Sequence, residues 1–206
     1  MDNIFELHRR AVEGVRPVLA RLDSADLALP TPCAGWDLRA LLEHMAGQDH
    51  GFAVAVRAAR TGGEVDVSEF APRPLGPSPD ATLATGLEEV VAAFAAGADD
   101  LVPLPEFGVR LPLPTVAGMH LVDTLVHGWD VAAALGEQAA YAARLDAEVV
   151  AAALTVAEQV PDDEAREVPG ASFGHALAAP LDSDPWTRTL TRLGRDPAWT
   201  AATFAR

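Results

Sequence analysis

The chain has 206 residues, of which 50% are hydrophobic and 22% charged, a composition that excludes extensive disorder. Its formal net charge of -15 argues against nucleic acid as a partner, because contact with phosphates requires a basic surface. The single cysteine, Cys33, excludes an intramolecular disulfide and a cysteine-based zinc site, and we expect it to be a buried free thiol.

Membrane insertion and export are not expected. No apolar run reaches the roughly 18 to 20 residues that cross a bilayer. The N-terminal segment MDNIFELHRR is acidic and amphipathic, unlike a signal peptide. We therefore expect a cytoplasmic protein without a membrane partner.

Apolar residues recur at helical spacing along most of the chain. Asp37 is a suitable N-cap for the second helix, and the segments 62–78 and 98–114 are irregular connections rich in Pro and Gly, the latter with room for a short extended piece. The expected helices cover 2–23, 37–60, 79–97, 115–135 and 143–160, with a shorter one at 185–193. This pattern predicts an all-α protein: a four-helix bundle with an extra helix over 1–160, and an irregular C-terminal tail, 161–206, that packs on it.

Four polar groups lie in the otherwise apolar stretch HLVDTLVHGWD, residues 120–130. On a helix, His120, Asp123 and His127 fall within roughly 60° of one another. A helix that is apolar on its other sides is a buried one, so this stripe should face the bundle interior or a cavity. Buried carboxylates and imidazoles must be paired or bound to a metal.

The spacing of Asp123 and His127 places both side chains on adjacent turns of one face, which is the geometry that a helix offers a metal ion. His44 on the second helix is a candidate third ligand, and its small neighbours, Gly47 and Gly51 among them, should leave space beside it. A site of two histidines and one carboxylate keeps a coordination position open, as in catalytic zinc sites.

Several alternatives remain open at this point. Asp130 is expected either to hold the tautomer of a ligand histidine or to cap a neighbouring segment. His120 is a fourth ligand, a hydrogen-bond partner of a ligand, or a substrate contact. Cys33 precedes the second helix and can approach the site. The stripe can also be a metal-free, hydrogen-bonded polar cluster.

The segments PTPCAGWDLRALLEHMAGQDHGFA, HLVDTLVHGWDVAAALG and LGRDPAW resemble the actinobacterial branch of the DinB-like superfamily, which is similar to the N-terminal domain of mycothiol-dependent maleylpyruvate isomerase. The resemblance implies a four-helix bundle whose divalent metal is held by His44, Asp123 and His127. Asp130 matches the family's acidic residue after the last ligand. The isomerase carries Glu in place of Asp123 and Arg in place of His120.

The resemblance implies zinc or another divalent metal, with mycothiol as thiol cosubstrate. The implied function is a metal-dependent thiol S-transferase or isomerase that acts on a small electrophile, and the implied assembly is a homodimer. The resemblance assigns no catalytic residue beyond the metal ligands. The alternative is a non-catalytic metal-binding or stress-associated bundle protein, for which a closed site of four ligands that includes His120 would be the signature.

Overall fold

The computed structural model describes residues 3–99, 101–167 and 173–201, and residue 2 of the first predicted helix lies outside them. In the described ranges, no helix is long and apolar enough to cross a membrane. The α-helices are α1 (Ile4–Leu19), α2 (Leu38–Ala59), α3 (Pro79–Ala96), α4 (Leu113–Ala134), α5 (Gln138–Ala142), α6 (Ala147–Ala157) and α7 (Pro185–Arg192). Short 3-10 helices are η1 (Ser24–Ala28), η2 (Val67–Phe70) and η3 (Glu164–Arg166), and the strands are β1 (Val102–Leu104) and β2 (Val109–Leu111).

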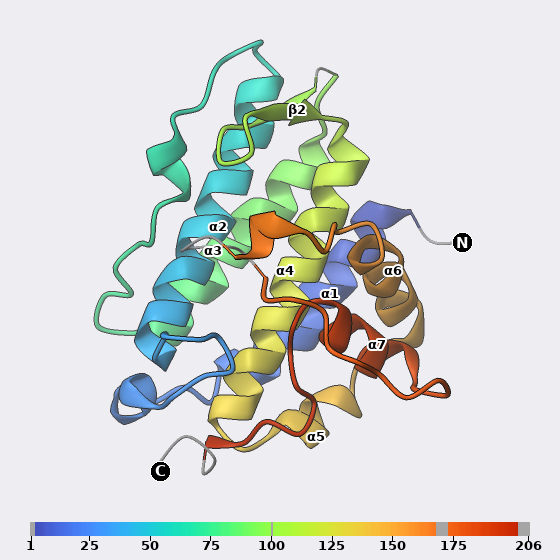
Figure 1. Ribbon diagram of the computed structural model, residues 1–206. Helices are drawn as coiled ribbons and strands as arrows, with labels where there is room; N and C mark the ends of the chain where they lie inside the picture. The colour runs from blue at the N-terminus through green and yellow to red at the C-terminus, as the bar shows by residue number, and fades with distance from the viewer. Residues whose placement is uncertain (1–2, 100, 168–172, 202–206) are drawn as a thin grey trace.

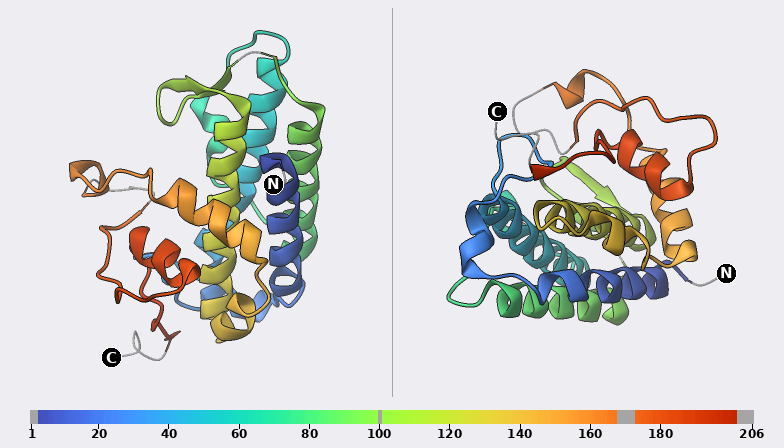
Figure 2. Two further views of the ribbon diagram at one scale, coloured as in Figure 1. Left: turned by 90° about the vertical axis from the view of Figure 1, so that its right-hand side faces the viewer. Right: turned by 90° about the horizontal axis from the view of Figure 1, so that it is seen from below.

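The four long helices form a two-layered bundle, with α1 and α3 in one layer and α2 and α4 in the other (Figure 2). Helix α1 packs mainly on α4, and α2 mainly on α3. The connection 60–78 runs back along the bundle, so α2 and α3 point in the same direction (Figure 1). The predicted all-α bundle with an additional helix and a C-terminal tail is confirmed.

Aspartate caps fix several helix starts. Asp37 accepts a hydrogen bond from the backbone N–H of Ala40, as the sequence predicts. The predicted start of the fifth helix is wrong, because Asp146 caps a helix that begins at Ala147, and a separate short helix, α5, lies before it. The side chain of Asp146 accepts backbone N–H groups of the first turn, which favours an extended backbone there and ends the preceding helix.

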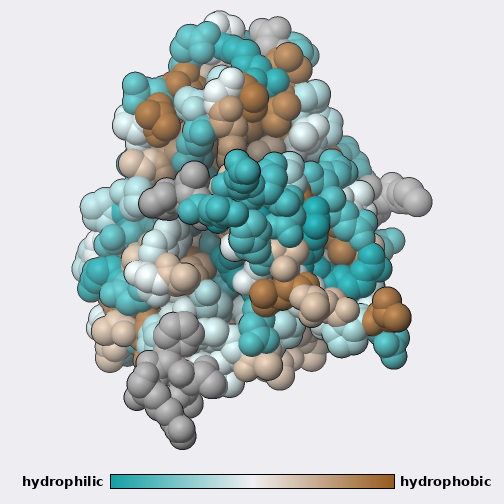
Figure 3. Space-filling view, in the orientation of Figure 1, coloured by the Kyte–Doolittle hydropathy of each residue, from teal (hydrophilic) through white to brown (hydrophobic). Residues whose placement is uncertain are grey.

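A short antiparallel hairpin lies within the predicted 98–114 connection. Strands β1 and β2 pair Val102 with Leu111, and Gly108 supplies the positive φ of the turn. In Figure 3 apolar side chains gather over this hairpin, where Phe107 is 51% exposed, while a hydrophilic band crosses the middle of the same face. The hairpin turn also carries Glu106 to α2, where it accepts a hydrogen bond from Gln48.

The C-terminal segment shares its core with the bundle. Helix α7 packs against α6, and α6 packs against α4 (Figure 2). Four apolar side chains of the C-terminal segment belong to the same buried cluster as residues of α1, α2 and α4, namely Trp186, Leu190, Leu193 and Trp199. The division of the chain at residue 160 stays a prediction.

Helix α4 is buried along nearly its whole length, and Gly128 lets its neighbours approach closely. A Cβ atom at this position would lie 2.6 Å from Tyr141 Oη and 2.8 Å from Val15 Cγ2. The hydroxyl of Tyr141 is fixed in turn, because it donates a hydrogen bond to the carbonyl of Leu125 at 2.9 Å. The close contact of α1 and Tyr141 with α4 therefore depends on glycine.

We expect Gly128→Ala to lower the free energy of unfolding by at least about 1 kcal/mol, because the added methyl overpacks the core by more than alanine's helix propensity restores. Gly14→Ala in α1 is the matched control, since a Cβ there meets nothing within 4 Å. That change should be neutral or stabilise the protein by roughly 0.4 to 1 kcal/mol. Urea unfolding measures both variants, and equal effects would contradict the packing explanation.

Candidate metal centre

His44 on α2 and the pair Asp123 and His127 on α4 converge in the bundle. One ligand atom from each of the three lies within 4.8 Å of the others, and Asp123 Oδ1 lies 3.4 Å from His127 Nε2. The two imidazole rings meet nearly edge to face, with centroids 5.1 Å apart. The structure therefore brings together the three predicted ligand residues, and metal binding by them stays a prediction.

The donor set fits a divalent ion. A tetrahedral zinc ion with bonds of roughly 2.0 to 2.1 Å places its ligand atoms about 3.4 Å apart. The distance between Asp123 Oδ1 and His127 Nε2 matches this value, so the shorter carboxylate side chain reaches far enough from α4. The Asp123 side chain is 22% exposed and that of His127 is 5% exposed. His127 is thus buried, whereas His44 and Asp123 are partly exposed, so solvent reaches the group.

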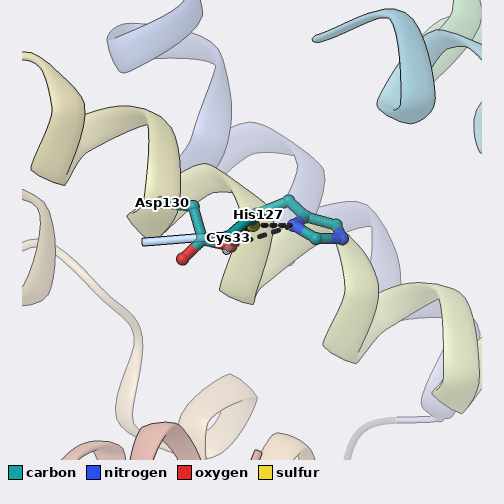
Figure 4. Close-up of side chains that lie close together, drawn as sticks. All are labelled: Cys33, His127 and Asp130. Atoms are coloured by element: carbon teal, nitrogen blue, oxygen red, sulfur yellow. Dashed lines mark hydrogen bonds and ion pairs between the residues drawn. The ribbon is translucent and has the colours of Figure 1, made fainter. Parts of the chain in front are cut away.

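Asp130 holds the other face of the His127 ring. Its Oδ2 atom accepts a hydrogen bond from Nδ1 at 3.0 Å, which leaves Nε2 directed at Asp123. The thiol of Cys33 also donates to Oδ2, at 3.1 Å (Figure 4). The guanidinium of Arg195 binds the same carboxylate through Nη2 at 3.1 Å and Nε at 3.2 Å. Asp130 therefore lies where the sequence predicts a residue that orients a ligand histidine.

The charges around His127 determine its protonation in the metal-free protein. Burial alone disfavours its imidazolium form, but the carboxylates of Asp123 and Asp130 hold its pKa well above the ordinary value. Burial lowers the pKa of His44 to about 4. Burial raises the pKa of Asp123, but the neighbouring imidazoles, His127 above all, have the larger effect and hold this pKa below its ordinary value.

His120 belongs to a different cluster. Its Nδ1 atom lies 2.8 Å from His8 Nε2, and its Nε2 atom lies 3.0 Å from Asp49 Oδ1. The hydroxyl of Thr124 is 3.1 Å from the same Nδ1 atom. Among the described residues, His120 is not part of a group whose ligand atoms converge for a metal ion.

Sequence reasoning missed the partners of His120. His8 lies within the apolar repeat of α1, and Asp49 follows His44 by five positions on α2, so neither spacing indicated a shared cluster. Within the described part of the chain, the Oδ2 atom of Asp49 has no hydrogen-bond partner. Burial raises the pKa of this carboxyl group.

The small residues near His44 do not serve the role expected for them. A Cβ at Gly47 would lie 2.4 Å from the carbonyl oxygen of Ala71, and one at Gly51 would lie 2.5 Å from the ring of Phe70. The expected space beside His44 is therefore filled by the segment that follows α2. Glycine is needed here so that this connection can pack on the helix.

Two further side chains interact with the three converging residues. The indole of Trp36, which is 36% exposed, packs on the ring of His44 with centroids 4.9 Å apart. Burial raises the pKa of Glu106, and the negative charge of Asp123 raises it further. An aromatic ring therefore packs on one of the three converging residues, and a further acidic group interacts electrostatically with another.

The family model of the mycothiol maleylpyruvate isomerase N-terminal domain matches residues 8–132, more than half of the sequence, and the chain belongs to this family. The crystal structure of the mycothiol-dependent maleylpyruvate isomerase has the same fold, with a TM-score of 0.50, and the match covers 76% of this chain and 68% of that one. At 16% identity this similarity is one of fold. The resemblance inferred from the sequence motifs is thus confirmed.

Two curated relatives match over nearly their full length. They are the uncharacterized proteins MT0763 and Rv0738 of Mycobacterium tuberculosis, from strains CDC 1551 / Oshkosh and ATCC 25618 / H37Rv. Each is 29% identical to this chain, with 91% of this chain and 95% of the relative covered. The high coverage of both sequences means that these relatives are similar to this chain in length.

We expect the metal-free protein to show opposite behaviour at its two converging histidines. His44 should stay neutral down to about pH 4, whereas His127 should stay protonated above its ordinary pKa of 6.5. Asp123→Asn removes one of the charges that stabilise the imidazolium, so it should lower the pKa of His127. Imidazole nitrogen chemical shifts followed through a pH titration measure each group.

The exposed His175, which pairs with Asp162 at 2.8 Å, is the internal control, because its titration should not change in the variant. A neutral His127 below pH 6.5, or a pKa that Asp123→Asn leaves unchanged, would show that the two carboxylates do not hold the proton.

Proposed function

We propose that this protein binds a divalent metal ion through His44, Asp123 and His127 and uses it in the transfer or isomerisation chemistry of a small-molecule thiol, mycothiol, with a small electrophile. The convergence of these three side chains at a partly open position in the bundle carries the proposal. Family membership supports the thiol, since the matching model is named for a mycothiol enzyme. Zinc is the ion we expect.

A divalent ion at this position supplies a positive charge that lowers the pKa of a bound thiol and so favours the nucleophilic thiolate. The chain's own residues hold the donor atoms in place. Asp130 keeps the proton of His127 on Nδ1, so that the lone pair of Nε2 is free to bind. Asp123, whose side chain is more exposed than that of His127, lies where a thiol and its electrophile would enter.

The number of protein ligands favours an enzyme over a structural metal site. His120 is engaged with His8 and Asp49 and does not join the other three residues. Three protein ligands leave one coordination position for a substrate, whereas structural zinc sites close with four. No described contact supports the closed site that the non-catalytic alternative requires. A cytoplasmic location and a homodimer stay predictions.

We expect protein purified without chelators to contain close to one equivalent of zinc or a similar ion per chain. His44→Ala and His127→Ala should each weaken zinc binding by more than about 100-fold, beyond the roughly 10- to 100-fold typical of losing a residue that only supports a ligand. Titration calorimetry and elemental analysis measure the two quantities.

His50→Ala is the matched control, because His50 lies on the same helix as His44 but pairs with Glu69 at 2.9 Å. It should bind zinc like the wild type. If the wild-type protein holds no metal and added zinc does not raise its melting temperature, the proposal is wrong and the stripe is a metal-free polar cluster.

Metal-loaded protein should accelerate the reaction of mycothiol with members of a panel of small electrophiles, and His127→Ala should abolish the acceleration. Product formation is followed by mass spectrometry, with reactions lacking the thiol or the protein as controls. A zinc-containing wild type that converts no electrophile with mycothiol would support the non-catalytic alternative instead.

A further inference from the structure

A second group of potential ligands shares His127 with the first. One ligand atom each from Cys33, His127 and Asp130 lies within 4.8 Å of the others (Figure 4). Cys33 Sγ is 3.9 Å from His127 Nδ1, and both atoms contact Asp130 Oδ2. Thiolate, imidazole and carboxylate are all good ligands for zinc, so residue type alone does not explain why an ion should prefer the first group.

Arg195 already places a cation against this second group. Its Nη2 atom lies 3.1 Å from Asp130 Oδ2 and 3.3 Å from Cys33 Sγ, and Nε lies 3.2 Å from Asp130 Oδ1. The two side chains of this ion pair are 6% and 0% exposed. Because a guanidinium does not lose its proton in proteins, the positive charge is permanent and repels a second cation.

The end of α7 delivers this guanidinium to the bundle. Gly194 has φ +74°, and a Cβ there would lie 2.7 Å from the carbonyl oxygen of Gly174, so only glycine fits the turn. The backbone N–H of Arg195 then donates to the carbonyl of Leu190 at 2.9 Å, and Nη1 donates to the carbonyl of Leu193 at 3.2 Å. The side chain is therefore held from the α7 side while it binds Asp130.

We propose that Arg195 determines which group of residues the metal ion uses, by serving as a built-in cation at Cys33, His127 and Asp130. The ion is thereby confined to the first group, through Nε2 of His127. Asp130 stays a hydrogen-bond acceptor for Nδ1–H, and Cys33 stays a protonated thiol outside the coordination sphere. This inference rests on the proposed metal centre, and it makes the C-terminal segment a part of that centre.

Cobalt(II) is the probe, because a cobalt–thiolate bond gives a near-ultraviolet charge-transfer band that nitrogen and oxygen ligands do not give. Metal-free wild-type protein titrated with cobalt should show no such band. Arg195→Met keeps an unbranched side chain without the charge, and it should show the band in proportion to bound cobalt. The double variant Arg195→Met with Cys33→Ser should lose the band again, which assigns it to the cysteine.

Further variants separate the charge from a structural role. Arg195→Lys retains a cation and should show no band, whereas Arg195→Gln, with a planar donor but no charge, should show it. Arg188→Met in α7 is the matched control, since Arg188 pairs with the exposed Glu158 and the variant should behave like wild type. Circular dichroism establishes which variants fold, and Arg195→Gln replaces Arg195→Met if the latter does not.

The outcomes distinguish this inference from the proposed function. A thiolate band in wild-type protein, or in Arg195→Lys, would overturn the inference, as would folded, uncharged variants that show none. A wild type that binds cobalt without the band, beside an Arg195→Gln variant that has it, supports both proposals. If the wild type binds no cobalt but the uncharged variant binds it through Cys33, the proposed function fails and the role of Arg195 stands.

Discussion

The site depends on one interaction, in which the carboxylates of Asp123 and Asp130 bind the two nitrogens of the buried His127 imidazole. Asp123 lies four residues before His127 on α4 and Asp130 three residues after it, so one helix presents an acid to each ring nitrogen. Two buried carboxylates beside one imidazolium leave an unbalanced negative charge. The charge of Arg195 balances Asp130, which leaves the Asp123 side of the ring available for a cation. The direction in which an ion can bind follows from this asymmetry.

The difference between the two sides of the His127 ring also reflects which parts of the chain supply the charges. The matched family model covers residues 8–132, which include the three converging residues and Asp130 but not Arg195. The guanidinium comes instead from the end of α7, 65 residues beyond its carboxylate partner. The bundle thus supplies the proposed metal ligands, and the C-terminal segment holds Asp130, which in turn binds Nδ1 of His127. The match to the relatives from Mycobacterium tuberculosis covers 91% of this chain and so extends beyond the range of the family model.

The sequence predicts those features that depend on local spacing. Helical periodicity predicts the bundle, and the four-residue spacing of Asp123 and His127, with the family resemblance, predicts the convergence on His44. Contacts set by tertiary packing were not predictable in this way. Nothing in the α1 pattern indicated that His8 would meet a histidine 112 residues away, and the motif LGRDPAW supported the resemblance without indicating a role for Arg195. The sequence suggests that Gly47 leaves space beside His44, whereas in the structure the backbone of Ala71 packs against Gly47 and requires glycine there.

Access to solvent, more than residue type, separates the two polar clusters on α4. His120 of α4 and Asp49 of α2 offer an imidazole and a carboxylate just as His127 and Asp123 do, and His120 lies about two turns before His127 on α4. Their side chains are only 0% and 5% exposed, while that of Asp123 is 22% exposed. An ion or a thiol must enter from solvent, and this buried pair, whose imidazole also contacts His8, gives it no entry. The cluster around His120 therefore supports the packing of α1, α2 and α4, whereas the one around His127 is the proposed metal centre.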